Sequence, residues 1–328
     1  MTVRSAAASR ARPRPATASK ARPRPATAPD ADPGTLIPLA LGTVQRLVSI
    51  DAECGATAAV PAVREALRSI PHLTSDPTRL RGRESDLLAA LAELCEVIGW
   101  ILFDAGFYGR AHHMNARALA LAELCGDRGM SRLVLLNDSM LDTHTGRPRR
   151  ALETASRVAG PRPLPARVSS LVLVRQAHAS ALLGGRREAV DLISRAQSRF
   201  LDGVSADDPH WAWWIDEIEL LGHRGWVHAR LREWDTAVPL LYEAATAPGP
   251  SYRHLFTAEL LAALVDSGAW SEAEDLITDI APRAGAIGSV RTTQTLASTA
   301  AQLLGCADAP TNLRDAAAFL LKCVPGSP

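Results

Sequence analysis

An alanine recurs five times at the same place in a repeated apolar pattern. These residues are Ala111, Ala151, Ala189, Ala237 and Ala273. They follow one another at intervals of 36 to 48 residues, and each lies five residues after a turn-forming position. The five turn positions are Gly106, Gly146, Gly184, Arg232 and Gly268.

Twelve positions before the alanine, four of the five units have a small residue. Seven positions after it, all five units have an apolar residue. The earlier residues are Gly99, Ser139, Ala177, Gly225 and Leu261. The later residues are Ala118, Val158, Ala196, Ala244 and Ile280. Small residues let two helices approach closely, and glycine readily adopts the left-handed conformation that ends a helix. Each unit therefore predicts a helical hairpin, and the recurrence predicts an all-α, right-handed helical solenoid, a class that mostly binds other molecules.

The expected helices follow from this pattern and from the turn residues between the apolar segments. The five hairpins are expected at 85–105 with 108–125, 130–145 with 148–159, 166–183 with 186–200, 211–231 with 234–247, and 252–267 with 270–280. Helices that depart from the repeat are expected at 36–50, 57–70, 289–304 and 313–321, because the end units of a solenoid must cap its core. The expected division is a tail over 1–34, capping helices over 35–84, and the repeat domain with its C-terminal caps over 85–328.

The N-terminal tail differs from the rest in composition and charge. It contains the direct repeat SRARPRPATA and SKARPRPATA, at 9–18 and 19–28. Residues 1–28 hold seven basic and no acidic residues, which leaves 29 basic and 35 acidic residues in the remainder. Closely spaced prolines and little apolar bulk predict disorder with local polyproline II character. The arginines could contact nucleic acid or an acidic partner, or the tail could be a solvated extension.

Composition excludes several other classes of protein. The apolar content of 47% in 328 residues is ample for a sizeable core. No apolar run reaches the roughly 18 residues of a membrane span, and no secretory signal is visible. The five cysteines are scattered without paired spacing, which favours buried reduced thiols in a cytoplasmic protein over disulfides or zinc ligation.

Two resemblances add to this interpretation. The small, alanine and apolar columns fall at the signature positions of the tetratricopeptide repeat (TPR), so the expected solenoid is TPR-like. Segments 99–130, 208–241 and 268–276 are similar to the C-terminal TPR-like region of actinobacterial XRE-type helix-turn-helix regulators, over roughly residues 36–305. That resemblance implies a role around transcriptional regulation of secondary metabolism or differentiation. We find no recognition helix ahead of Leu36, so direct sequence-specific DNA binding is not expected.

Aligned hairpins place large and polar side chains on one face of each first helix, because offsets of three, four and seven residues share a helix face. In TPR-like solenoids this face lines the concave surface, so the side chains predict a groove for a ligand or partner. The candidate binding residues are Trp100, Asp104, Asn137, Met140, His144, Arg175, His178, Trp214, Glu219, His223, Trp226, Arg230 and Glu259. The same residues could equally be ordinary core and solvated polar groups.

Two further clusters admit two interpretations each. Trp211, Trp213 and Trp214 could form an aromatic wall or anchor the preceding loop on the solenoid, with Trp211 and Trp214 on one helical face. Asp207, Asp208 and His210 could bind a cation, but either aspartate could equally cap a helix that starts at Trp211. We expect no metal and no cofactor.

The function expected from the sequence is a sensor or adaptor that binds a small molecule or a protein partner in its concave face. A homodimer is compatible with the sequence, and no membrane association is expected. No recognised nucleophile, metalloprotease or nucleotide-binding motif is present, so no catalytic residue is assigned. An enzyme built on the same scaffold remains the alternative, with Arg175, Asp216, Glu219 and His223 in a closed pocket. A third hypothesis is weak, sequence-blind nucleic-acid binding through the tail.

Overall fold

The computed structural model describes residues 33–158, 163–203 and 206–325 of the chain. These segments form fourteen α-helices, joined by loops and five short 3-10 helices, without a β-strand. This confirms the all-α, TPR-like architecture that the repeated pattern predicts. The predicted disordered tail lies outside the described residues, except that α1 already begins at Pro33.

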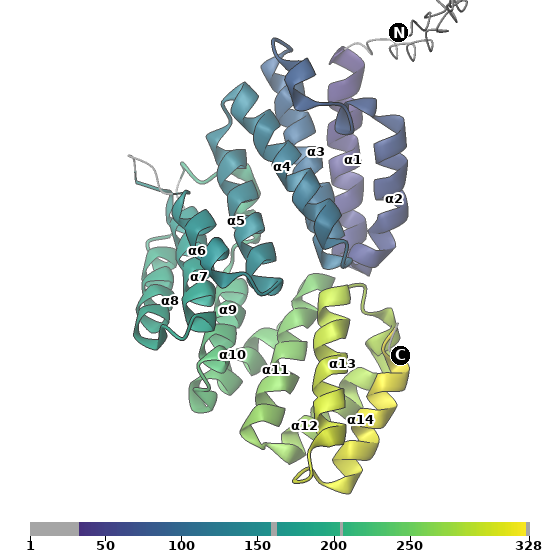
Figure 1. Cartoon of the computed structure of the whole chain (residues 1–328), viewed down its shortest axis with the longest axis vertical. Helices are drawn as coiled ribbons and strands as arrows, with labels where there is room; N and C mark the ends of the chain where they lie inside the picture. Colours follow the sequence, from purple (N-terminus) through teal and green to yellow (C-terminus); the bar gives the residue numbers. More distant parts are fainter. Residues whose placement is uncertain (1–32, 159–162, 204–205, 326–328) are drawn as a thin grey trace, which may run out of the picture. The chain divides into compact units, whose positions relative to one another are not determined.

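The helices run in chain order from one cap to the other (Figure 1). The N-terminal cap and the first two hairpins comprise α1 (Pro33–Cys54), α2 (Ala56–Ser69), α3 (Ser85–Asp104), α4 (Tyr108–Cys125), α5 (Arg128–His144) and α6 (Pro148–Ser156). The next three hairpins comprise α7 (Ala166–Leu182), α8 (Arg186–Leu201), α9 (Glu217–Arg230), α10 (Trp234–Thr246), α11 (His254–Ser267) and α12 (Trp270–Ile280). The closing pair is α13 (Val290–Gly305) and α14 (Thr311–Cys323). The 3-10 helices are η1 (Pro71–Leu73), η2 (Pro77–Leu80), η3 (His210–Trp214), η4 (Ser251–Arg253) and η5 (Ala281–Ala286).

The repeated columns of the sequence are the contacts inside the hairpins. All five repeated alanines are fully buried. All five turn positions have a left-handed backbone, with φ between 59° at Arg232 and 82° at Gly106. A Cβ atom on Gly99 would lie 2.2 Å from the Asn115 side chain, and one on Gly225 would lie 2.7 Å from Leu241. The close approach of the two helices therefore requires glycine at these two positions.

The fourth hairpin departs from the prediction at its first helix. A continuous helix over 211–231 was expected, but the tryptophan cluster forms η3, and α9 starts only at Glu217. The Asp216 side chain accepts a hydrogen bond from the Glu219 backbone N–H at 2.8 Å, so it caps α9 and separates it from η3. The expected α-helix over the tryptophan cluster is therefore wrong, but Trp211 and Trp214 keep the i, i+3 spacing that shares a face in a 3-10 helix. The α-helix starting at Trp211 that Asp207 or Asp208 could have capped is not formed, because η3 begins at His210 after Pro209.

The N-terminal helices meet the C-terminal part of the chain. The Thr57 backbone N–H donates to the Gly288 carbonyl at 2.9 Å, and the Ser251 hydroxyl donates to the Asp51 carbonyl at 2.7 Å. A Cβ atom on Gly55 would lie 2.6 Å from the Gly288 Cα, so the two backbones touch. The solenoid thus closes on itself instead of ending in two free caps.

A buried ion pair completes this closure. Arg291 on α13 donates from Nε to Asp104 Oδ1 at the end of α3, at 2.6 Å, and the Ser289 hydroxyl donates to the same oxygen at 2.9 Å. The guanidinium also lies over the Phe103 ring, 4.4 Å from its centroid. Since both charges are nearly inaccessible to water, each depends on the other to offset its desolvation.

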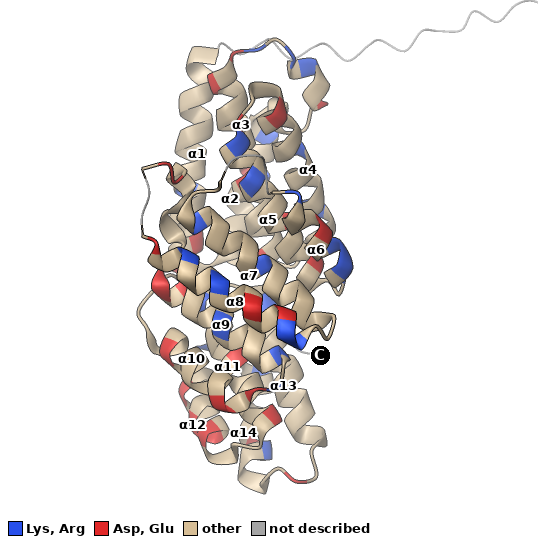
Figure 2. Cartoon of the chain, turned by 90° about the vertical axis from the view of Figure 1, so that its left-hand side faces the viewer, with Lys and Arg blue, Asp and Glu red and all other residues tan. Residues whose placement is uncertain are grey.

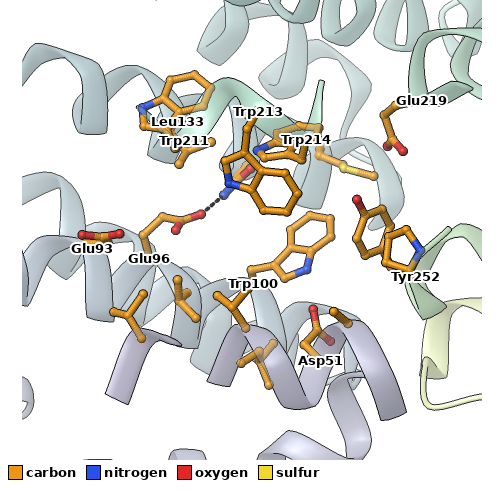
Figure 3. Close-up of a pocket in the computed structure, with 18 of the residues that line it drawn as sticks. Asp51, Glu93, Glu96, Trp100, Leu133, Trp211, Trp213, Trp214, Glu219 and Tyr252 are labelled. Carbon is orange, nitrogen blue, oxygen red and sulfur yellow. Dashed lines mark hydrogen bonds between the residues drawn. The ribbon is translucent and has the colours of Figure 1, made fainter. Parts of the chain in front are cut away.

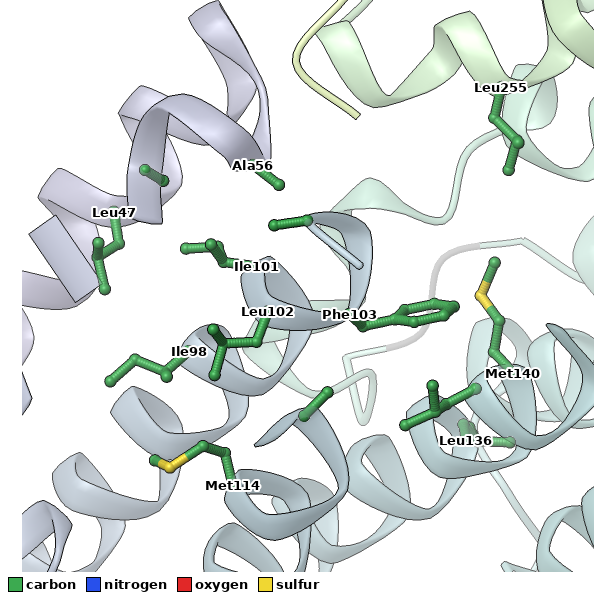
Figure 4. Close-up of a cluster of buried hydrophobic side chains, with 14 of the residues drawn as sticks. Leu47, Ala56, Ile98, Ile101, Leu102, Phe103, Met114, Leu136, Met140 and Leu255 are labelled. Carbon is green, nitrogen blue, oxygen red and sulfur yellow. The ribbon is translucent and has the colours of Figure 1, made fainter. Parts of the chain in front are cut away.

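The apolar core follows the helices from α1 to α14. Figure 4 shows its central part, where Ile98, Ile101 and Leu102 of α3 lie close to Leu47 of α1, and Phe103 lies near Met140. Figure 2 shows residues of both charge signs along the outer helices. None of the described helices is long and apolar enough to cross a membrane.

Arg232 provides a test of the turn geometry, because it is the one described residue other than glycine with a positive φ. A side chain in this conformation costs roughly 1–2 kcal/mol. We expect Arg232→Gly to raise the free energy of unfolding by about 0.5–1 kcal/mol, since part of that gain is lost to the entropy of glycine in the unfolded chain. The matched Gly184→Ala, where a Cβ meets nothing within 4 Å, should lower it by about 1 kcal/mol. Urea unfolding measures the free energy of unfolding of both variants. A change of the same sign in both would contradict a left-handed backbone at these turn positions.

The closing ion pair provides a second test. Asp104→Asn leaves the Arg291 charge buried without a counter-ion, so we expect it to lower the free energy of unfolding by about 3 kcal/mol. The double variant Asp104→Leu/Arg291→Met should recover most of that loss in urea unfolding. Asp279→Asn, which breaks an exposed pair with Arg283, is the control and should cost at most about 0.5 kcal/mol. A loss in Asp104→Asn no larger than in this control would show that the closure contributes little.

Candidate functional site

The inner face of the closed solenoid surrounds a cavity of about 640 Å³. The first helix of every hairpin contributes lining residues, as do α1 and α13. Residues of η3 and η4 complete the wall. The first helices, which the sequence predicts to line a concave surface, do line this cavity, and the cavity is partly open to solvent.

Several aromatic side chains line this cavity. Its aromatic residues are Trp100, Trp211, Trp213, Trp214, Tyr252 and Phe256. Figure 3 shows Trp213 and Trp214 from η3 reaching over the cavity toward Trp100 on α3. Four of the seven tryptophans of the chain therefore face one space, which suits a ligand with a planar or apolar body.

One part of the wall is acidic. Glu96 accepts a hydrogen bond from Asn137 Nδ2 at 2.6 Å, and burial raises the pKa of its carboxyl group to about 8. The neighbouring Glu93 lies 3.7 Å from His210 Nε2. Glu96 therefore holds a proton at neutral pH, and its carboxyl group can donate as well as accept a hydrogen bond.

A second group consists of Asp51, Trp100 and Arg291. Asp51 on α1 is buried and hydrogen-bonds to the Trp100 side chain, while its Oδ1 has no hydrogen-bond partner among the described residues. Burial and the nearby charge of Asp104 raise the pKa of Asp51 to about 7. The guanidinium of Arg291 lies over the Trp100 ring, 5.2 Å from the centroid.

A third group is centred on His223. Arg175 Nη1 lies 3.4 Å from His223 Nε2, and Glu219 Oε1 lies at the same distance from that nitrogen. Nδ1 of His223 is 3.1 Å from His178 Nε2. Burial lowers the pKa of both histidines well below the usual value, lowers that of Arg175 to about 10, and raises that of Glu219 to about 7. Both ring nitrogens of His223 therefore face protein groups, with the ring in its neutral form.

The structure places seven of the thirteen predicted binding residues on the cavity wall. They are Trp100, Asn137, Met140, Arg175, Trp214, Glu219 and His223. These residues come from four different first helices and from η3, and the closed fold brings them to one space. Their role in binding remains a prediction.

The other six predicted residues also lie on first helices but do not line the cavity. They are Asp104, His144, His178, Trp226, Arg230 and Glu259. Asp104 holds Arg291, and Arg230 pairs with Glu259 at 3.1 Å. His144 Nε2 is 3.0 Å from the Tyr108 hydroxyl, and the Trp226 ring stacks on His223. They support the wall, and the alignment of repeats could not separate them from the lining residues.

Sequence reasoning missed Asp51, Tyr252 and Arg291. These residues lie on α1, η4 and α13, outside the aligned columns, and they reach the cavity through the closure. Glu96 was also missed, although the two acids Glu93 and Glu96 within the apolar run of α3 were a visible signal.

The described residues contain no group of three or more His, Cys, Asp or Glu side chains placed to hold a metal ion. His210, which the cation interpretation groups with Asp207 and Asp208, lies 3.7 Å from Glu93. Asp216, named in the enzyme hypothesis, caps α9 and pairs with Arg253, and it is not on the cavity wall.

Comparison with known proteins adds one structural likeness. No protein-family model matches the chain, and no curated protein matches it. Among solved structures, the chain is similar to Rap protein complexed with Competence and Sporulation Factor, with 11% sequence identity and a TM-score of 0.47. The match covers 87% of this chain and 96% of that chain. The chain's own residues define an all-α helical-repeat protein with a pocket on its inner face.

The raised pKa of Glu96 predicts how stability depends on pH. Between the ordinary value of 4.5 and the folded value of about 8, the folded protein binds the proton more tightly than the unfolded chain. The free energy of unfolding therefore falls as pH rises through this window. Glu96→Gln keeps an acceptor for Asn137 but cannot ionise, so its free energy of unfolding should fall less steeply and exceed the wild-type value at pH 8. Urea unfolding at several pH values measures this, and parallel profiles would contradict a protonated Glu96.

Proposed function

We propose that this chain is a regulatory binding protein that holds a small molecule in the cavity enclosed by its first helices. One observation carries the proposal. Five buried side chains on the cavity wall each have a polar atom without a hydrogen-bond partner in the described part of the chain. The atoms are Asp51 Oδ1, Arg175 Nε, Trp211 Nε1, Glu219 Oε2 and Arg291 Nη1.

The energetic argument is that such atoms are costly. An unsatisfied buried donor or acceptor costs about 1–3 kcal/mol, and more than about 90% of buried backbone polar groups and most buried side-chain polar atoms in proteins have a partner. Five of these atoms belong to side chains that line one cavity, and a molecule bound there, or water in its place, is the partner that we propose for them. The volume of about 640 Å³ lies within the range of small-molecule sites.

A small molecule fits this site better than a protein segment. The contacts of Thr57 with Gly288 and of Asp104 with Arg291 join the two ends of the solenoid around the cavity. A polypeptide segment would need an open concave groove, whereas a small molecule can enter and be enclosed. The partner-binding alternative predicts that this closure opens in the complex.

The regulatory part of the proposal has a structural basis and a sequence basis. The ligand would contact helices from α1 to α13 at once, so its binding would favour the closed arrangement of the whole repeat domain. The similarity of three segments to XRE-type regulators supports a role around transcription in the cytoplasm. Nucleic-acid binding by the tail concerns residues outside the described part.

The enzyme alternative receives less support. Arg175, Glu219 and His223 do line the enclosed cavity, as that hypothesis requires, but Asp216 does not. Both nitrogens of His223 lie within 3.4 Å of protein groups. A general base needs a free nitrogen within reach of the substrate, so the geometry suits binding better than proton transfer.

A cavity-filling variant tests the proposed function. Val97 lies on the cavity wall, so Val97→Trp should place an indole ring inside the cavity and block small-molecule binding by steric clash. The control Leu201→Trp adds the same ring at a site where the side chain is 72% exposed. The measurement is native mass spectrometry beside a thermal-shift screen of metabolites. We expect a retained mass or a raised melting temperature in the wild type and in Leu201→Trp, and neither in Val97→Trp. Hits that bind Val97→Trp as well as the wild type would overturn the proposal.

A further inference from the structure

Two buried ionisable side chains of opposite type on the cavity wall, Asp51 and Arg175, lack an ion pair in the described part of the chain. Asp51 is 8% exposed, and its carboxylate meets the Trp100 side chain while Oδ1 has no partner. Arg175 is 2% exposed, with Nη1 near the neutral His223 ring and Nε without a partner. Glu219 acts on Arg175 only at longer range, and burial outweighs its effect.

The other charged groups of the wall already have partners close by. These contacts are Asp104 with Arg291, Arg253 with Glu219, His210 with Glu93, and Asn137 with Glu96. The first and last of them are strong hydrogen bonds, at 2.6 Å each. Asp51 and Arg175 are therefore the buried charges that gain most from groups supplied by a ligand.

Asp51 and Arg175 also lie on different walls. Asp51 belongs to α1 and Arg175 to α7, and the intervening helices α3 and α5 contribute Trp100 and Met140 to the wall between them. Figure 1 shows α1 and α7 in different parts of the helical array. Neighbouring packed helices are about 8–10 Å apart, so a ligand that meets both residues must extend past the apolar and aromatic side chains between them.

A ligand with a single charge would satisfy one of these residues and leave the other buried and unpaired. We propose that the cavity binds a small zwitterion that carries a primary ammonium group at one end of an apolar body and a carboxylate at the other. Asp51 accepts from the ammonium group, Arg175 donates to the carboxylate, and the tryptophans enclose the body. This inference rests on the proposed function, because it names the ligand class of the same cavity.

Isothermal titration with matched probes tests the charge requirement. The probes are 8-aminooctanoate, octylamine and octanoate, which share one aliphatic body and differ only in their charged ends. A hydrogen bond to a charged group contributes about 1.5–3 kcal/mol, so each end should change the affinity about 10- to 100-fold. We expect 8-aminooctanoate to bind at least about tenfold more tightly than either single-charge probe. Equal or tighter binding of octylamine or of octanoate would overturn the inference.

Two variants assign the ends of the ligand. Asp51→Asn should weaken the binding of 8-aminooctanoate and octylamine about tenfold or more and leave octanoate binding unchanged. Arg175→Met should weaken the binding of 8-aminooctanoate and octanoate to a similar extent and leave octylamine binding unchanged. The matched controls Asp191→Asn and Arg195→Met break an exposed pair elsewhere and should change none of the three affinities. A general loss of structure would weaken all probes together, so the opposite selectivity of the two variants separates charge recognition from packing. Equal effects on all probes would overturn the assignment, and Arg175→Met decides alone if Asp51→Asn does not fold.

The outcome also separates this inference from the proposed function. If other small molecules bind the wild type and not Val97→Trp, while 8-aminooctanoate binds no better than its single-charge relatives, the cavity binds a ligand of another class. If no small molecule binds in a manner sensitive to Val97→Trp, the proposed function fails, and the zwitterion inference fails with it.

Discussion

The closure between α3 and α13 is the constraint on which the rest of the structure depends. A helical solenoid normally offers an open concave surface, because each repeat contacts only its neighbours. Here Asp104 and Arg291 form a buried pair across 187 residues of sequence, and Gly55 meets Gly288 backbone to backbone. These contacts bring α1 and α13 to the same space, so the inner surface lines a cavity.

The closure also sets the electrostatics of the cavity. Excluding water from the inner face raises the pKa values of Asp51, Glu96 and Glu219 and lowers those of His178 and His223. In each case burial is the main cause, because it disfavours the charged form. A protein selected for stability alone would fill such a space with apolar side chains. Keeping several buried, incompletely bonded groups around one cavity is a cost to folding that ligand binding would offset.

The repeat pattern predicts the hairpins well because it records contacts that are local in sequence. The alanine column, the left-handed turns and even the exceptional Arg232 follow from two helices that must pack closely, and the structure reproduces them. The break between η3 and α9 could not be predicted from the repeat pattern, because the residues on both sides of it are compatible with one helix. The break arises because the Asp216 side chain caps the start of α9. About half of the predicted binding residues lie on the cavity wall, because an aligned column gives the face of a helix but not the depth of each side chain.

The sequence could not predict the contacts between the N-terminal helices and the C-terminal part of the chain. Asp51, Tyr252 and Arg291 lie in end segments that no repeat aligns, and their approach depends on the accumulated rotation of all the hairpins. The tryptophans illustrate the same limit. Their clustering was visible in the sequence, but only the fold shows that Trp213 and Trp214 reach toward Trp100 across an enclosed space (Figure 3).

The most direct test of the central claim is a crystal structure of the protein purified without added ligands. The account predicts a closed solenoid, with Asp104 bonded to Arg291 and electron density for a small molecule or ordered water between Trp100 and Trp213. Density that extends from Asp51 toward Arg175 would be the expected form of a bound ligand. A solenoid with separated ends, or a cavity filled by its own tryptophan side chains, would contradict the account.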